Sequence, residues 1–134
     1  MSPRPLLFPP RRQDRRPGRF RPSAPVVRAA GPAALLAPAA AALQSVGIEL
    51  VPNRGNDSSA RCATPSRGLI DKATAAWMRL LADAGPERFS QAFCIECDET
   101  GLALGAGGPA GLLYGLLYLA EAWDNGLECG SFAD

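Results

Sequence analysis

The amino-acid sequence predicts an α+β fold built as a single domain. Two stretches carry this expectation: residues 91–106 alternate as a β-hairpin does, and residues 109–123 form an apolar helical pattern directly behind it. With 134 residues, 47% of them apolar and 20% charged, the chain is long enough to bury one sizeable core. The sequence shows no internal repeat that would divide it further.

The first thirty residues predict short edge strands. Proline has no backbone N–H to donate to a central ladder, so proline-rich extended segments belong at the edges of a sheet. We assign such strands to residues 5–8, 19–22 and 24–30, the last with the sequence APVVRAA.

A helix and a further strand are predicted next. Alanine and leucine favour a helix at Ala33–Val46, which Gly47 ends and which Pro38 is expected to kink or divide. Residues 47–52, GIELVP, alternate as a short strand does.

The middle of the chain is patterned less sharply. Residues 53–68, NRGNDSSARCATPSRG, are polar and predict a loop, and together with residues 1–4 we expect them to be mobile. Residues 71–85 have the composition of a helix, but AWMRLLA at 76–82 is also compatible with a strand, and the pattern alone leaves both open. A turn is expected at 85–90.

The β-hairpin is the clearest local signal. Its strands are QAFCIEC at 91–97 and LALGA at 102–106, joined by DETG at 98–101. A four-residue connection that ends in glycine suits a type I turn whose last residue is left-handed. Alternation places two sets of side chains on one face: Phe93, Ile95 and Cys97 on the first strand, and Leu102, Leu104 and Ala106 on the second.

The glycine-rich stretch after the hairpin, GAGGPAGLLYGLLYLAEAW at 105–123, admits three interpretations. A dinucleotide site requires G-x-G-x-x-G, but the spacing of Gly105, Gly107 and Gly111 is one residue too long. A membrane span requires roughly 20 apolar residues, and only about 12 are predicted to be helical here. The third interpretation, which we prefer, is a buried helix with Pro109 in its first turn.

This helix has apolar residues on several sides. Gly111, Gly115 and Ala122 make a narrow side that lets another backbone come close, and Tyr114 and Tyr118 can keep their hydroxyls at the rim. We therefore expect the helix to be covered on more than one side, by its own sheet and by a further domain. Two apolar stripes complete it: Leu112, Leu116, Leu119 and Trp123, and Leu113, Leu117 and Ala120.

Charge is distributed unevenly along the chain. Residues 1–28 contain eight arginines and one aspartate, whereas the rest has six basic and twelve acidic side chains, so the net charge of +1 hides +7 and −6. Such a basic segment indicates either an arm for nucleic acid or membrane lipid, or an edge strand lined with arginines, and we prefer the edge strand. The arginines are Arg4, Arg11, Arg12, Arg15, Arg16, Arg19, Arg21 and Arg28.

The cysteines do not define a functional site. Cys94 and Cys97 form a C-x-x-C, but strand alternation sends their side chains to opposite faces, and the chain has no histidine to complete a zinc site. We therefore assign no metal-binding and no cofactor-binding residue. The four cysteines are Cys62, Cys94, Cys97 and Cys129.

The hairpin that runs directly into GGPAGLLYGLLYLAEAW resembles the end of the N-terminal, non-catalytic domain of glycoside hydrolase family 20, the β-N-acetylhexosaminidases. The last helix of that domain typically opens with a short turn and G-x-x-Y-G, here Gly111 to Gly115. The opening strand is similar too, with prolines followed by G-x-F at 18–20, and residues 24–52 are similar to its strand, helix and strand. The resemblance spans residues 5–123.

This resemblance implies a two-layer α+β domain, a mostly antiparallel sheet with two helices packed on one face, lying against a catalytic (β/α)8 barrel. It also implies that AWMRLLA at 76–82 is a strand. In the family the barrel removes a terminal N-acetylhexosamine by substrate-assisted catalysis, with an Asp-Glu pair. A related domain precedes the barrel of α-glucuronidases, which are the alternative parent enzymes.

From the resemblance we expect residues 1–123 to form the accessory domain and residues 124–134 a short tail, with the barrel absent. Asp98 and Glu99 fall in the hairpin turn and not on a barrel strand, so no catalytic residue is assigned and the chain alone is predicted to be inactive. The expected partner is the catalytic barrel of a glycosidase, with no specific nucleic acid and no membrane. The chain is then expected to be a fragment, a truncated product or a detached accessory domain of this hydrolase.

Overall fold

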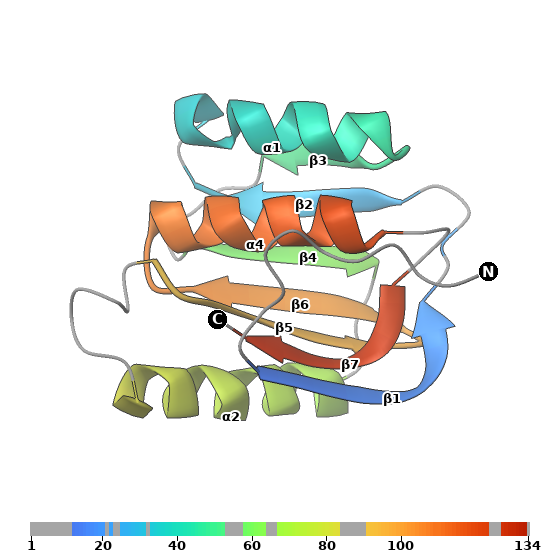
Figure 1. The fold of residues 1–134 in the computed structure, drawn as a ribbon, viewed down its shortest axis with the longest axis vertical. Helices are drawn as coiled ribbons and strands as arrows, with labels where there is room; N and C mark the ends of the chain where they lie inside the picture. Colours follow the sequence, from blue (N-terminus) through green and yellow to red (C-terminus); the bar gives the residue numbers. More distant parts are fainter. Residues whose placement is uncertain are drawn as a thin grey trace.

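Seven strands form one sheet in the part of the chain that the structure describes. The computed structural model describes residues 12–20, 22, 25–31, 33–52, 58–63, 67–83, 91–123 and 127–133. Its elements are β1 (Arg12–Phe20), β2 (Val26–Ala30), α1 (Ala33–Ser45), β3 (Glu49–Pro52), β4 (Ser59–Ala63), α2 (Arg67–Asp83), β5 (Phe93–Asp98), β6 (Gly101–Ala106), α4 (Pro109–Ala122) and β7 (Leu127–Ala133). The strand order is β1-β7-β5-β6-β4-β2-β3 (Figure 1), and the pairings are antiparallel except for the parallel pair β2 and β3. The predicted α+β class and mostly antiparallel sheet are confirmed.

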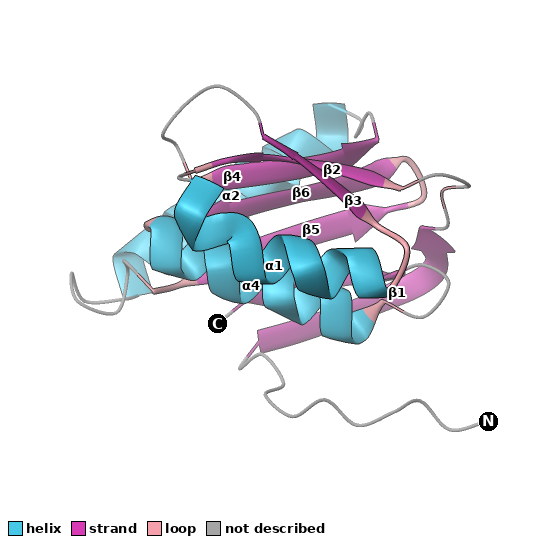
Figure 2. Ribbon diagram, turned by 90° about the horizontal axis from the view of Figure 1, so that it is seen from above, coloured by secondary structure: helices cyan, strands magenta, loops and turns pink. Residues whose placement is uncertain are grey.

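Helices cover both faces of this sheet. α1 and α4 lie side by side on one face, as predicted, and α2 lies on the other face against β5 and β6 (Figure 2). The prediction of only two layers therefore needs one correction, because α2 adds a third. Ala76 of α2 packs against Ala92 and Cys94, which form a cluster separate from the core beneath α1 and α4.

The segment AWMRLLA at 76–82 lies inside α2, so the strand implied by the family resemblance is wrong. Alanine, leucine, methionine and arginine are all strong helix formers, and here this local preference decides the structure. The loop predicted at 53–68 is wrong for most of its described residues: β4 occupies residues 59–63, and α2 begins at Arg67. Residues 1–4, 53–57, 64–66 and the turn predicted at 85–90 lie outside the described residues.

The two N-terminal strands occupy different places in the sheet. β1 is an edge strand, as predicted for this basic, proline-containing part of the chain, but it spans Arg12–Phe20, so the bounds predicted at 19–22 are wrong and overlap it only at residues 19 and 20. The strand predicted at 5–8 lies outside the described residues. β2 is not an edge strand, because it pairs with both β3 and β4. Pro25 immediately precedes β2, so its missing N–H removes no bond within the strand. Its carbonyl accepts the Glu49 N–H at 3.1 Å.

Residues 127–133 form strand β7 and are not a tail outside the domain. β7 pairs with β1 on one side and with β5 on the other, and Leu127 is buried. The boundary predicted at residue 123 is therefore too early. The sequence LECGSFA has no β-branched residue and three small ones, so its strand structure depends on partners that are distant in sequence.

The predicted β-hairpin is present as β5 and β6. Phe93, Ile95 and Cys97 share one face and belong to the main core, as predicted. The turn is tighter than expected: Asp98 pairs with Gly101, and Gly101 is not among the described glycines with positive φ. Asp98 closes this turn, because its Oδ1 accepts the Thr100 N–H at 2.7 Å and the Thr100 hydroxyl.

Both predicted helices of the α1–α4 layer are present. α1 contains Pro38 without ending there, and the chain leaves α1 through Gly47, whose φ of 85° is in the left-handed region that glycine tolerates. α4 begins with Pro109 in its first turn, where the missing N–H costs nothing.

The main core lies between the sheet and the α1–α4 layer. Leu112, Leu116 and Leu119 of α4 are fully buried against the hydrophobic face of the sheet. Burying one such leucine contributes about 1.5–3 kcal/mol, so α4 supplies a large share of the stability of the domain. Sheet residues of the same core include Val27, Cys62, Ile95, Cys97, Leu102 and Leu104.

Candidate functional site: the outer surface of the α1–α4 layer

The glycines of α4 bring this helix into close contact with the sheet. A Cβ atom on Gly111 would lie 2.2 Å from the carbonyl oxygen of Ala92, and one on Gly115 would lie 2.8 Å from Cδ1 of Leu104. Tyr118 continues the same side and stacks on Phe93 with ring centroids 5.9 Å apart. The glycine spacing that the sequence shows is thus explained by helix-to-sheet packing, as the preferred interpretation predicts.

The second side of α4 is covered by α1. A Cβ atom on Gly31, just before α1, would approach Cδ2 of Leu112 to 2.9 Å, and Leu36 and Leu43 of α1 are buried in the same core. At the end of α4, Trp123 meets Phe20 of β1 edge-to-face, with ring centroids 6.3 Å apart. The expectation that α4 is covered on more than one side is therefore met within the chain. Cover by a further domain stays a prediction.

The outward side of this layer carries almost no charge. Residues 29–48, which include all of α1, contain no acidic or basic side chain. On α4 the exposed or half-buried residues include Leu113 and Leu117, which also pack against the main core, Tyr114, which is 47% exposed, and Glu121. The exposed residues of α1 are small or uncharged: Ala34, Ala37, Pro38, Ala41, Gln44 and Ser45. We call this set of exposed and half-buried residues the α1–α4 surface.

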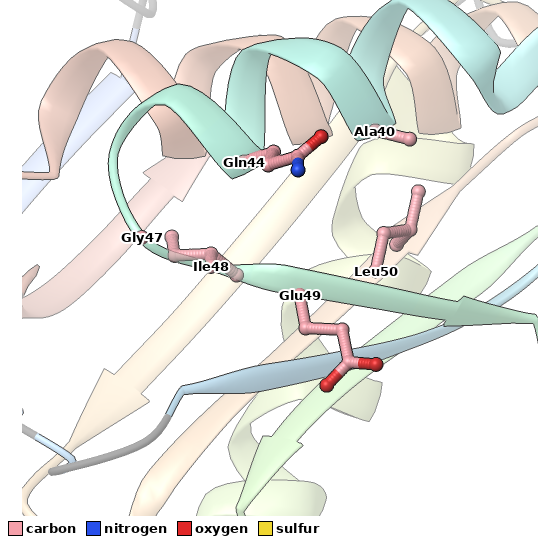
Figure 3. Close-up of a pocket in the computed structure, with 6 residues that line it drawn as sticks. All are labelled: Ala40, Gln44, Gly47, Ile48, Glu49 and Leu50. Carbon is pink, nitrogen blue, oxygen red and sulfur yellow. The ribbon is translucent and has the colours of Figure 1, made fainter.

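A shallow depression borders this surface at the outer edge of the sheet. It has a volume of about 540 Å³ and is lined by Ala40, Gln44, Gly47, Ile48, Glu49 and Leu50 (Figure 3). The Leu50 side chain points toward α1, whereas the Glu49 carboxylate points away from it. The polar side chains of this lining are the Gln44 amide and the Glu49 carboxylate, and the carboxylate points away from the depression. These two groups do not form an acid–base pair.

The carboxylates that the sequence places in the hairpin turn lie at its tip. Asp98 is half-buried and bonded to Thr100, while Glu99 is exposed. Asp98 thus has a structural explanation as the residue that closes the turn.

The C-x-x-C pair is divided between the two faces of the sheet, as predicted. Cys97 lies in the main core and Cys94 lies in the small cluster beneath α2. Burial raises the pKa of the Cys94 thiol from 9.0 to about 11, which keeps it protonated and unreactive near neutral pH. Cys62, Cys94 and Cys97 are free thiols, and the described residues contain no group of three or more potential metal ligands.

The fold separates Arg28 from the other described arginines of the N-terminal segment. Arg12, Arg15, Arg16 and Arg19 lie on the edge strand β1, whereas Arg28 lies on β2, with strands β7, β5, β6 and β4 in between. Adjacent strands are about 4.8 Å apart, so five steps place Arg28 roughly 24 Å from β1. Arg28 therefore does not share a patch with the arginines of β1, and register instead places it opposite Arg61 of β4. Arg4, Arg11 and Arg21 lie outside the described residues.

Comparisons with known proteins leave the family open. No protein-family model matches the chain, and no curated protein matches it by sequence. Within the described ranges, no helix is both long enough and apolar enough to span a membrane.

Proposed function

We propose that this chain is an accessory, non-catalytic domain of a β-N-acetylhexosaminidase-like glycoside hydrolase, and that its α1–α4 surface packs against a (β/α)8 barrel. The sequence resemblance at both ends of the domain supports this proposal, and so does the sheet with two helices on one face. The observation that carries it is the almost uncharged outward side of these two helices. A helix that faces water normally presents a polar side, so this surface is suited to contact with protein.

The size and chemistry of the surface fit an interface between domains. Helices of 13 and 14 residues are each about 20 Å long, and packed helices lie about 8–10 Å apart, so the pair offers roughly 20 Å by 20 Å. Covering such an area on both partners buries an amount within the usual range of about 600–1,500 Å². The alanines at 34, 37 and 41 let a partner backbone approach closely, and Tyr114 offers an amphipathic anchor.

Catalysis belongs to the barrel in this proposal. The resemblance implies that a barrel Asp-Glu pair polarises the acetamido group of the substrate and protonates the leaving oxygen. The present chain contributes support for the barrel and no reacting group. The alternative parent, an α-glucuronidase-type enzyme, would use the same docking surface, and only the substrate of the barrel separates the two. A nucleic-acid module based on the N-terminal arginines is less well supported, because four of them lie along the edge strand β1, as the preferred interpretation of this segment expects, and Arg28 lies apart from them on β2.

The test combines binding with an activity assay. The chain is mixed with the barrel of a family 20 β-N-acetylhexosaminidase whose own accessory domain has been removed, and binding is measured by titration calorimetry. We expect a complex, and we expect A41E to weaken it about tenfold or more by burying an unpaired charge. A75E on α2 is the matched control, because Ala75 is also exposed on a helix.

The same preparation tests the absence of catalysis in this chain. We expect no turnover of an aryl N-acetylglucosaminide by the chain alone. Turnover that disappears in Asp98→Asn or Glu99→Gln would refute the non-catalytic role. Equal weakening of the complex by A41E and A75E would refute the docking surface.

A further inference from the structure

Two arginines face each other on the sheet face opposite α1 and α4. Arg28 of β2 pairs in register with Arg61 of β4, and both side chains are exposed. Their neighbours along the strands, Val27 and Cys62, are buried in the main core. Because side chains alternate along a strand, Arg28 and Arg61 project from the other face, the one on which α2 lies.

The described helix on this face packs mainly on strands other than those of the arginine pair. α2 packs against β5 and β6, so the part of the face formed by β2 and β4 extends beyond the strands on which this helix lies (Figure 1). Apart from Glu49, the nearest described neighbours on this face are small or apolar: Val26, Ala30, Val51, Ser59 and Ala103. Most of the described side chains around Arg28 and Arg61 are therefore shorter than the arginine side chains themselves.

The charge of the pair is not neutralised by its described neighbours. Like charges directly opposite each other destabilise a pair of strands, and within the described part of the chain neither Arg28 nor Arg61 makes an ion pair. Glu49 of β3 lies on the same face but opposite Val26, one diagonal step from Arg28. Glu96 is two strands away from Arg61, beyond Ala103, and is buried.

We propose that Arg28 and Arg61 together bind an oxyanion, the phosphate or sulfate group of a small ligand. Directly opposed residues have Cβ atoms about 4.5–5.5 Å apart, which allows both guanidinium forks to donate to one tetrahedral group. Binding would turn the mutual repulsion of the arginines into attraction toward a shared anion. The described neighbours include no aromatic ring on which a base could stack, so the site favours an isolated anionic group over a nucleic-acid strand. This site is independent of the proposed docking function, because it lies on the other face of the sheet.

Titration with inorganic phosphate at constant ionic strength tests this site. The readout is the NMR signals of the arginine Nε–H groups, which report each side chain separately. We expect saturable shifts for Arg28 and Arg61, and about tenfold weaker binding in each of R28Q and R61Q. R79Q is the matched control, since Arg79 is an exposed arginine on α2, and it should leave the affinity unchanged.

A parallel titration with inorganic sulfate distinguishes the two ligand classes. Tighter phosphate binding would support a phosphate ester as the ligand, and tighter sulfate binding would support a sulfate ester. The proposal is overturned if neither anion produces saturable shifts, or if R79Q weakens binding as much as R28Q does. It is also overturned if only an oligonucleotide binds, because that result would indicate a nucleic-acid surface.

A stability measurement checks the repulsion independently. In low salt without phosphate, R61Q should raise the melting temperature, because it removes one of two opposed positive charges at an exposed site. Adding phosphate should raise the melting temperature of the wild-type chain and not that of R61Q. A lower melting temperature for R61Q in both conditions would contradict the repulsion.

Discussion

The helices on the two faces of the sheet present different surfaces to their surroundings. α2 exposes Arg67, Asp71, Lys72 and Arg79, as a helix in water does, whereas α1 exposes no charged residue at all. The apolar clusters beneath these helices also differ in size: a large core lies beneath α1 and α4, and a small cluster around Cys94 lies beneath α2. Burial within the chain therefore explains why the inner sides of α1 and α4 are apolar, but not why their outer sides lack charge.

The largest effect in this comparison is expected for a glycine of α4. In G111A the new Cβ would lie 2.2 Å from the carbonyl oxygen of Ala92, so helix and sheet must separate. We expect a loss of about 3 kcal/mol or more in the free energy of unfolding, measured in urea. G68A in α2 is the control, because its Cβ meets nothing within 4 Å, and it should be neutral or stabilise by up to about 1 kcal/mol. A loss below 1 kcal/mol for G111A would contradict the close packing of α4.

A core leucine gives the next effect. Leu116 of α4 is fully buried, so L116A should lower the free energy of unfolding by about 2–5 kcal/mol, because it removes apolar contacts and leaves a cavity. M78A in α2 should change it by less than about 0.5 kcal/mol, since Met78 is 58% exposed. Similar losses of unfolding free energy in L116A and M78A would contradict the difference in burial between α4 and α2.

The pH dependence of stability reports on the layer beneath α2. Burial raises the pKa of Cys94 from 9.0 to about 11, so between these values the unfolded chain releases a proton that the folded chain retains. This contribution to stability is complete below pH 9 and is lost as the pH rises toward 11. The expected slope is at most about 1.4 kcal/mol per pH unit, and C94A should flatten it. An unchanged slope in C94A would show that Cys94 is accessible to water in the folded chain.

Local sequence signals were sufficient for much of the α1–α4 side of the fold. The hairpin, the helix after Pro109 and the helix before Gly47 each follow from residues within a few positions of one another. The glycines at 111 and 115 also predicted the side of α4 that packs closely: Gly111 approaches the backbone of Ala92, and Gly115 approaches the side chains of Leu104 and Phe93. These features were predictable because periodicity, capping and turn chemistry are properties of adjacent residues.

The features that the sequence left undetermined depend on distant partners. β4 and β7 contain no β-branched residue, and each exists because two neighbouring strands complete its hydrogen bonds. α2 was ambiguous because its apolar residues suit a helix and a strand alike. The pairing of Arg28 with Arg61 depends on the register between β2 and β4, which no local pattern specifies.

The α1–α4 surface can be tested most directly by following its alanine methyl groups in the presence of the barrel. In a chain with ¹³C-labelled alanine methyls, the signals of Ala37 and Ala41 report this surface, and that of Ala75 reports the exposed side of α2. We predict that adding the β-N-acetylhexosaminidase barrel shifts or broadens the signals of Ala37 and Ala41 and leaves Ala75 unchanged. Equal changes at all three, or changes confined to Ala75, would contradict the account.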